Sequence, residues 1–280
     1  MRESAPEEPH VRVEKLVKRY GDRTVLHGVD MTIGRAETLV IIGGSGAGKS
    51  TLVRHLIALE RPTSGRIVVD NIDVAALSDI ELNIARRRFG MVFQKYALFD
   101  SMTNYENVAF PLREQTKLAE KDIRERVMAK LKDLSVEHAA ELTPAQISGG
   151  MAKRVGIARA LVMEPELLIY DEPTSGLDPV TSRTVDDLID EMREKFGVTS
   201  VVITHDMVSA FDIADKIAML IKGKVVAEGS PAEVLTVAND DVQRFIRSSG
   251  VEASRLESRR DRKPAHELAK VARARKDRAL

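Results

Sequence analysis

The sequence predicts an α/β protein with a mainly parallel sheet that helices cover on both faces. An antiparallel β-segment is expected before this core, and an α-helical subdomain is expected as an insertion into it. Three observations support this fold class. The apolar run 38–42 leads through a glycine-rich stretch into leucines at helical spacing, strand-like and helix-like segments alternate from 167 to 226, and the part between, 95–165, is mainly helix-like.

Two strands are expected before the glycine-rich stretch. Apolar residues from Val11 to Val17 predict the first strand, which ends at the turn signal 20–22. Apolar residues from Val25 to Ile33 predict the second, although their alternation is imperfect. Residues 1–10 are rich in proline and glutamate, so we expect this N-terminus to be disordered.

The glycine-rich stretch has the residues and the flanks of a phosphate-binding loop. It reads Gly43, Gly44, Ser45, Gly46, Ala47, Gly48, Lys49 and Ser50, followed by Thr51. The strand-like run 38–42 precedes it, and a helix with leucines up to Leu59 is expected after it. Glycines let backbone N–H groups point at an anion, and the helix N-terminus adds partial positive charge. We expect a nucleoside triphosphate here, with Lys49 on its β- and γ-phosphates and the Ser50 hydroxyl on Mg²⁺.

The inserted helical part is expected after a strand over 90–94 that ends on a glutamine. Thr103 is suited to cap a helix that stops at Pro111, because proline breaks helices. A second helix is expected from about Glu120. Its apolar stripe consists of Ile123, Val127, Leu131 and Leu134. A break at Ser148-Gly149-Gly150 then precedes a helix over 151–162.

The alternating core is expected to resume after the helical part. Its further elements are strand 167–172, a helix from Asp178 that Gly197 closes, strand 199–205, helix 206–214, and a hairpin that turns at 222–224. Asp171 follows four apolar strand residues, so its carboxylate should emerge at the carboxyl edge of the sheet and hold Mg²⁺ through water. Glu172 should point to the other face as a candidate general base for an attacking water. The alternative is a solvated acidic loop.

The composition restricts the function classes. The chain has 280 residues with 43 basic and 43 acidic side chains, so no overall positive charge favours a nucleic-acid partner. It contains no cysteine, which excludes disulfides, cysteine-ligated zinc and thiol catalysis. No signal peptide is expected, and the apolar runs are far shorter than the roughly 20 residues needed to span a bilayer. We therefore expect any membrane role to depend on a partner.

The order of these motifs resembles the nucleotide-binding subunit of ABC transporters over residues 11–245. The most specific element is 147–154, where the family usually has glutamine in place of Met151. The resemblance implies a P-loop NTPase (ABC ATPase) core. Its expected divisions are the core 11–94 and 166–245, a helical signature subdomain 95–165, and a basic C-terminal extension 246–280.

The resemblance also implies roles for single residues in binding ATP and Mg²⁺. His205 would contact the γ-phosphate, Gln94 would contact Mg²⁺ or the attacking water, and Tyr20 would stack on adenine. Without the family, a strand-end histidine or tyrosine is more often structural, and Gln94 would be a polar loop residue. Ser148, Gly149 and Gly150 would serve the ATP bound by a second copy, and Asp178 would lie at the same interface. These roles imply a head-to-tail dimer with each ATP sandwiched between two copies.

The cargo is predicted from the segment after Gln94. The segment 95–114 is similar to that of the Mla/MCE-associated ATPases, which energise phospholipid transport between bacterial membranes. This similarity implies permease subunits, an MCE-domain protein as a further partner, and a peripheral location at the cytoplasmic face of the inner membrane. One alternative is an importer of a small polar solute such as an amino acid. Others are an ABC ATPase acting on DNA or ribosomes, and a nucleotide sensor without turnover.

The tail from 251 onward carries ten Lys/Arg against five Asp/Glu. Three interpretations stay open: a solvated tail, a helix that docks on the neighbouring subunit, and a contact with anionic lipid. The acids Glu267 and Asp277 argue against the lipid contact, so docking is favoured over it.

Overall fold

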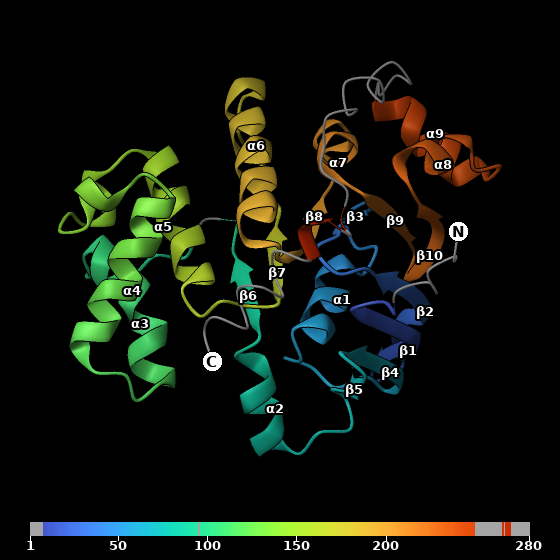
Figure 1. The fold of residues 1–280 in the computed structure, drawn as a ribbon. Coiled ribbons are helices and arrows are strands. Elements are labelled where there is room, and N and C mark those ends of the chain that lie inside the picture. The colour runs from blue at the N-terminus through green and yellow to red at the C-terminus, as the bar shows by residue number, and fades with distance from the viewer. Residues whose placement is uncertain (1–7, 95, 250–264, 266, 270–280) are drawn as a thin grey trace, which may run out of the picture. The chain divides into compact units, whose positions relative to one another are not determined.

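The computed structural model describes residues 8–94, 96–249, 265 and 267–269, and it contains two compact units (Figure 1). The core unit consists of Met1–Arg86 and Glu172–Leu280. The inserted unit consists of Arg87–Asp171. The fold is of the α/β class that the sequence predicts.

The first sheet of the core unit is antiparallel, as predicted. Its order is β2-β1-β4-β5, with β1 at Val11–Tyr20, β2 at Arg23–Ile33, β4 at Ser64–Val69 and β5 at Ile72–Asp73. Buried Val11 and Val13 pair with Ile33 and Met31 across β1 and β2. Gly21 forms the turn between these two strands with a φ of 56°, a conformation that glycine adopts readily.

The second sheet of the core unit has β3 at its centre. The strands are β3 (Thr38–Ile42), β8 (Thr199–Thr204), β9 (Lys216–Ile221) and β10 (Lys224–Gly229). β3 runs parallel to β8 and to β9, whereas β9 and β10 form an antiparallel hairpin. Every residue of β3 and of β8 is buried, which matches the continuous apolar runs expected of central parallel strands.

Several helices of the core unit lie among the residues that the structure describes up to 249. They are α1 (Lys49–Leu56), α2 (Asp79–Arg86), α6 (Pro179–Phe196), α7 (Met207–Ile213), α8 (Pro231–Thr236) and α9 (Asp240–Ser249). α7 packs on β3, β8, α6 and α9, and α8 packs on the hairpin of β9 and β10. Asp178 caps the start of α6, and Gly197 ends that helix with a φ of 62°, as the sequence predicts.

The inserted unit combines the strand pair β6 (Phe89–Val92) and β7 (Leu167–Asp171) with helices α3 (Asn104–Gln115), α4 (Glu120–Asp133) and α5 (Gly149–Leu161), and Figure 1 draws α3 and α4 in green and β7 in yellow. β6 runs parallel to β7, and α3, α4 and α5 pack on one another. The predicted stripe of α4 is buried in full. Thr103 and Glu106 form a capping box at the start of α3, which confirms the predicted cap.

Four expected boundaries are wrong. α3 continues past Pro111, because burial of Val108 and Leu112 on the same helix outweighs the helix-breaking cost of proline, about 3 kcal/mol. α1 ends at Leu56, and Leu59 lies beyond it with 56% of its side chain exposed. β6 ends at Val92 rather than at the glutamine, and β7 ends at Asp171.

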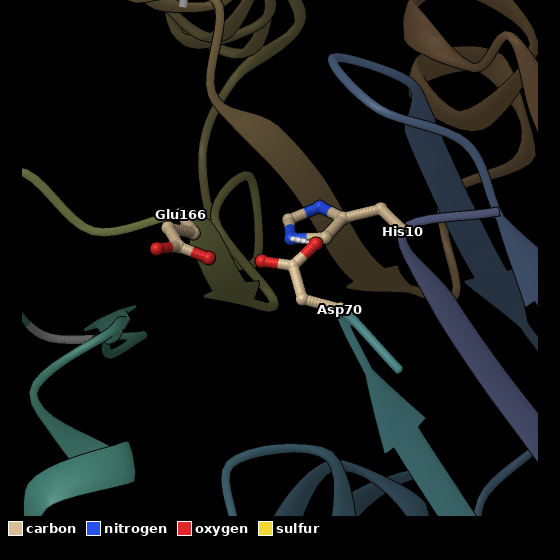
Figure 2. Close-up of side chains that lie close together, drawn as sticks. All are labelled: His10, Asp70 and Glu166. Atoms are coloured by element: carbon tan, nitrogen blue, oxygen red, sulfur yellow. Dashed lines mark ion pairs between the residues drawn. The ribbon is translucent and has the colours of Figure 1, made fainter. Parts of the chain in front are cut away.

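Buried polar contacts tie β1 to the start of β8. The His10 ring places Nδ1 2.7 Å from the Thr199 hydroxyl and Nε2 3.7 Å from a carboxylate oxygen of Asp70 (Figure 2). Glu166, also drawn there, belongs to the inserted unit and pairs with Arg88 within it. Of the segment predicted to be disordered, residues 1–7 lie outside the described residues, but His10 is buried.

The C-terminal extension is described only in part. α9 covers its first residues, and 250–264, 266 and 270–280 lie outside the described residues. Leu268 and Ala269 are buried in a cluster with Ala36 of the core unit. Among the described residues, no helix is both long and apolar enough to cross a membrane.

Candidate nucleotide site

The phosphate-binding loop joins buried β3 to α1, as the sequence predicts. A side chain at Gly43 would place its Cβ 2.2 Å from the carbonyl oxygen of Leu220, so only glycine fits there. Gly46 and Gly48 have φ values of 74° and 106°, which L-residues rarely adopt. The turn 222–224 braces the loop, because the N–H of Gly223 donates to the carbonyl of Ala47 at 2.9 Å.

Lys49 lies folded over this loop at the first position of α1. Its ammonium donates to the carbonyl of Gly43 at 2.7 Å and to that of Gly44 at 3.3 Å. Only 11% of its side chain is exposed. The ammonium, the N–H groups of the loop and the first turn of α1 together form an anion-binding arrangement.

Glu172 connects Lys49 to His205 within the core unit. Its Oε1 lies 4.0 Å from Lys49 Nζ, and its Oε2 lies 2.8 Å from His205 Nδ1. The backbone N–H of Glu172 donates to the carbonyl of Ile203 in β8, and φ is 49°. The sequence prediction assumed that strand alternation turns the Glu172 side chain to the face opposite Asp171. Because Glu172 lies outside the strand with a positive φ, alternation does not set its direction. L-residues adopt this left-handed conformation infrequently.

Tyr20 ends β1, and its side chain is 43% exposed. Its hydroxyl donates to Glu60 Oε2, and the Lys18 ammonium lies 5.0 Å from its ring centroid. Burial, together with the bond to Glu60, raises the pKa of Tyr20. The sequence predicts a role for Tyr20 alone, because Lys18 and Glu60 carry no motif that would mark them.

Asp178 serves as the N-cap of α6. Its Oδ1 accepts from the N–H groups of Val180 and Thr181, both at 3.0 Å, and the Thr181 hydroxyl donates to its Oδ2 at 2.5 Å. The Thr181 hydroxyl bond is the main reason that the pKa of Asp178 is lowered. Val180, the next residue but one, has 77% of its side chain exposed. This exposed helix start is compatible with the interface role that the resemblance implies.

The remaining predicted site residues belong to the inserted unit. Gln94 is exposed two residues after β6, and Asp171 is the half-buried last residue of β7. The Ser148 hydroxyl caps α5 by accepting from Met151 N–H at 3.3 Å. Cβ atoms added at Gly149 and Gly150 would meet no described atom within 4 Å. Packing within this chain therefore does not explain why these two positions are glycine.

The segment after Gln94 is held firmly inside the inserted unit. Arg159 donates to the carbonyls of Tyr96 and Ala97 at 2.6 and 2.8 Å, and the Asn107 amide donates to that of Phe99 at 3.1 Å. Burial raises the pKa of Tyr96 to about 12. A Cβ at Gly156 would lie 2.9 Å from the Tyr96 Cβ, so this glycine makes room for the ring. Tyr96 thus packs inside, whereas Phe99 stays 41% exposed.

The site residues fit a nucleoside triphosphate with Mg²⁺. Space beside Gly44 and Gly46 is open among the described residues, so an anion can approach the loop backbone closely. Ser50 is exposed in the first turn of α1, and a hydroxyl oxygen is a hard ligand of the kind that Mg²⁺ prefers.

A family model described as "ABC transporter" matches residues 26–175, which is more than half of the chain. The chain belongs to the ABC transporter family. It is the ATP-binding subunit of such a transporter and an ABC ATPase. The sequence resemblance is confirmed at this level.

Relatives of this ABC ATPase are named for different cargoes, among them methionine, phospholipid and ribonucleotide. The Methionine import ATP-binding protein MetN 2 of Rhodococcus jostii is 45% identical, over 81% of this chain and 68% of that protein. The Intermembrane phospholipid transport system ATP-binding protein MlaF of Haemophilus influenzae is 36% identical, over 85% of this chain and 90% of that protein. A solved dimeric post-hydrolysis structure of the ATP-binding cassette MJ0796 with ADP and Pi is 34% identical with a TM-score of 0.69, over 79% of this chain and 98% of that chain.

Proposed function

We propose that this ABC ATPase hydrolyses ATP at the phosphate-binding loop with Glu172 as the general base. The placement of Glu172 between Lys49 and His205 supports this proposal most directly. The Nδ1–H of His205 donates to Oε2, which orients the carboxylate and leaves Oε1 to accept a proton from the attacking water. Lys49 would exchange its bonds to loop carbonyls for the β- and γ-phosphates, where its charge offsets that of the transferred group.

Mg²⁺ would offset the phosphate charge when bound, and three residues are proposed to hold it. Ser50 would ligate it directly, Asp171 would act through water, and Gln94 would contact Mg²⁺ or the attacking water. Tyr20 is proposed to stack on the adenine ring. These assignments rest on the family motif at each position.

We also propose a head-to-tail dimer in which Ser148, Gly149 and Gly150 of one copy contact the ATP of the other. Two observations support it. The described residues leave open space beside the two glycines, so crowding within this chain does not account for them. The similar MJ0796 cassette forms a dimer. Asp178 would lie at the same interface, where the exposed start of α6 is available. ATP would close the dimer and hydrolysis would reopen it, as a ligand-driven population shift.

The dimer can be tested by mixing two inactive variants. Lys49→Ala damages the phosphate loop of its own chain, and Ser148→Arg blocks the signature loop of its own chain. In a mixed head-to-tail dimer, one site combines an intact phosphate loop with an intact signature loop. Phosphate release should therefore recover in part on mixing. A mixture as inactive as each variant alone contradicts the proposal.

For the cargo, we propose phospholipid transport of the Mla/MCE type, with the ATPase bound peripherally to permease subunits at the cytoplasmic face of the inner membrane. The similarity to MlaF over 90% of that protein's length supports this choice, as does the segment after Gln94. Import of a small polar solute is the second candidate, favoured by the higher identity to MetN 2 over a smaller share of its length.

Affinity capture from the native membrane discriminates the two candidates. The bait is the full chain carrying Glu172→Gln. This variant should retain ATP, so its dimer should stay closed and remain bound to the transporter. Recovery of a permease together with an MCE-domain protein supports the phospholipid proposal. Recovery of a permease with a solute-binding protein overturns it in favour of import. The Lys49→Ala bait controls for capture that does not depend on nucleotide.

A further inference from the structure

Three charged side chains surround Tyr20 at the end of β1, and none belongs to a nucleotide motif. Lys18 lies two residues earlier on the same strand. Arg54 belongs to α1, and Glu60 belongs to the segment after α1. Only 16% of the Lys18 side chain and 23% of the Glu60 side chain are exposed, whereas Tyr20 is 43% exposed. Tyr20 is therefore more exposed than Lys18 and Glu60, the two side chains that contact it.

Lys18 covers one face of the ring. Its Nζ lies 5.0 Å from the ring centroid, within the range of a cation–π interaction. The ammonium is fixed there, because it donates to the carbonyl of Arg61 at 2.8 Å and pairs with Glu60 at 3.5 Å. A cation held on one face leaves the opposite face for a stacking partner.

Glu60 holds the hydroxyl end of the Tyr20 ring. It accepts the hydroxyl of Tyr20 on Oε2, while its Oε1 lies 3.3 Å from Arg54 Nη1. The ring is thus held both at its hydroxyl and across one face. A phenol is protonated at neutral pH, so Tyr20 donates to Glu60 there, and burial together with this bond raises the pKa of Tyr20 further.

We propose that Lys18 and Glu60 are positioning residues that hold the Tyr20 ring as a one-sided platform for the adenine ring of ATP. The inference rests on the proposed role of Tyr20 and names the residues that make it effective. A ring already held in the bound orientation loses less conformational freedom when the base stacks on it. Both residues would act through Tyr20 and not through the phosphates, which are proposed to bind at Lys49 and the loop.

The test compares two probes that share phosphates and differ in the base. ATP carries the base, whereas inorganic tripolyphosphate has none. We expect Lys18→Met and Glu60→Ala each to raise the Kd for ATP about two- to five-fold, as a cation–π contact or a hydrogen bond of this kind implies. The Kd for tripolyphosphate and the turnover at saturating ATP should stay at the wild-type values. Lys18→Arg keeps a cation on the ring and should restore ATP affinity.

Arg19→Met is the matched control, since Arg19 is an exposed cation beside Tyr20 whose loss changes the local charge equally. It should leave the Kd for ATP unchanged. An unchanged Kd for ATP in Lys18→Met and Glu60→Ala overturns the inference, and so does an equal loss of tripolyphosphate affinity. Failure of the proposed function looks different: Lys49→Ala would then bind both probes normally, or Tyr20→Ala would bind ATP like the wild type.

Discussion

Polar groups lie near both ends of strand β3, and their contacts differ between the two ends. Before Thr38, the fully buried Arg193 donates to the carbonyl of Ala36 at 2.9 Å and pairs with Asp215 at 2.9 Å. After Ile42, Lys49 is bonded only to the carbonyls of its own loop among the hydrogen bonds the structure describes, and it lies at 4.0 Å from Glu172.

The difference shows where stability and function are separated in this chain. The Arg193 contacts at the start of β3 are made inside the protein, so we expect them to stabilise the fold. At the other end of β3, the described residues leave open space beside Gly44 and Gly46 of the loop, and His205 keeps 63% of its side chain exposed. Substitutions at the two ends should therefore affect different measurements.

Glu172→Gln should give the largest effect and act at the functional end alone. The amide cannot accept a proton, so phosphate release should fall about 10²- to 10⁴-fold, the usual contribution of a general base. ATP binding by equilibrium titration should persist, and dimers should accumulate with ATP. Glu141→Gln, an exposed acid of the inserted unit, should release phosphate at the wild-type rate. Unchanged turnover in Glu172→Gln would remove the general base from the proposal.

Arg193→Met tests the other end of the strand. It leaves the Asp215 carboxylate without its buried partner, which should lower the free energy of unfolding by about 3 kcal/mol in urea titrations. Folded protein should still bind ATP with wild-type affinity. Arg244→Met removes a guanidinium that is 78% exposed and should change stability little. A loss below about 1 kcal/mol for Arg193→Met would show that this end is not held by the pair.

Lys49→Met should weaken ATP binding and leave the free energy of unfolding unchanged, which is the opposite of the result expected for Arg193→Met. Removing charge-assisted bonds to phosphate should weaken ATP binding about 10- to 100-fold. The free energy of unfolding without ATP should stay close to wild type, because the described hydrogen bonds of the ammonium go to carbonyls of its own loop and join no distant elements. Equal losses of stability and affinity would mean that the functional end also carries the fold.

How much of this contrast the sequence predicts depends on how local each feature is. The strand 38–42, the glycine loop and the start of α1 are predicted correctly, because their residues specify conformation over a few neighbours. The strained φ of Glu172 was missed, since it is imposed by a backbone bond to Ile203 more than thirty residues away. The contacts of Lys18 and Glu60 with Tyr20 were missed for the same reason.

The buried end of β3 was also absent from the sequence interpretation. Arg193 looks like any solvated residue late in a helix, and only the arrangement of α6 against the β2–β3 turn buries it. Pro111 shows the reverse error, in which a strong local signal was overruled by packing. Local signals thus identified the ligand-binding end of the strand, whereas tertiary contacts decided the stabilising end.

Asp186 is a buried acid of α6. Its carboxylate accepts from the Ser209 hydroxyl at 2.5 Å and joins α6 to α7, the helix that follows His205. Burial, with Asp206, Asp212 and Asp190 nearby, raises the pKa of Asp186 to about 7. Since the folded state binds this proton more tightly than the unfolded chain, the stabilisation is complete at low pH and is lost as pH rises through about 7.

The resulting pH dependence is the smallest effect expected. Linkage predicts that the free energy of unfolding falls by about 1.4 kcal/mol between pH 6 and pH 8 through Asp186. Asp186→Asn cannot titrate, so urea unfolding at the two pH values should show a loss smaller by that amount. Asp187→Asn, on the exposed side of α6, should keep the wild-type difference. If Asp186→Asn keeps the wild-type difference between pH 6 and pH 8 too, that difference comes from another group. Asp186 then titrates as a solvated acid would.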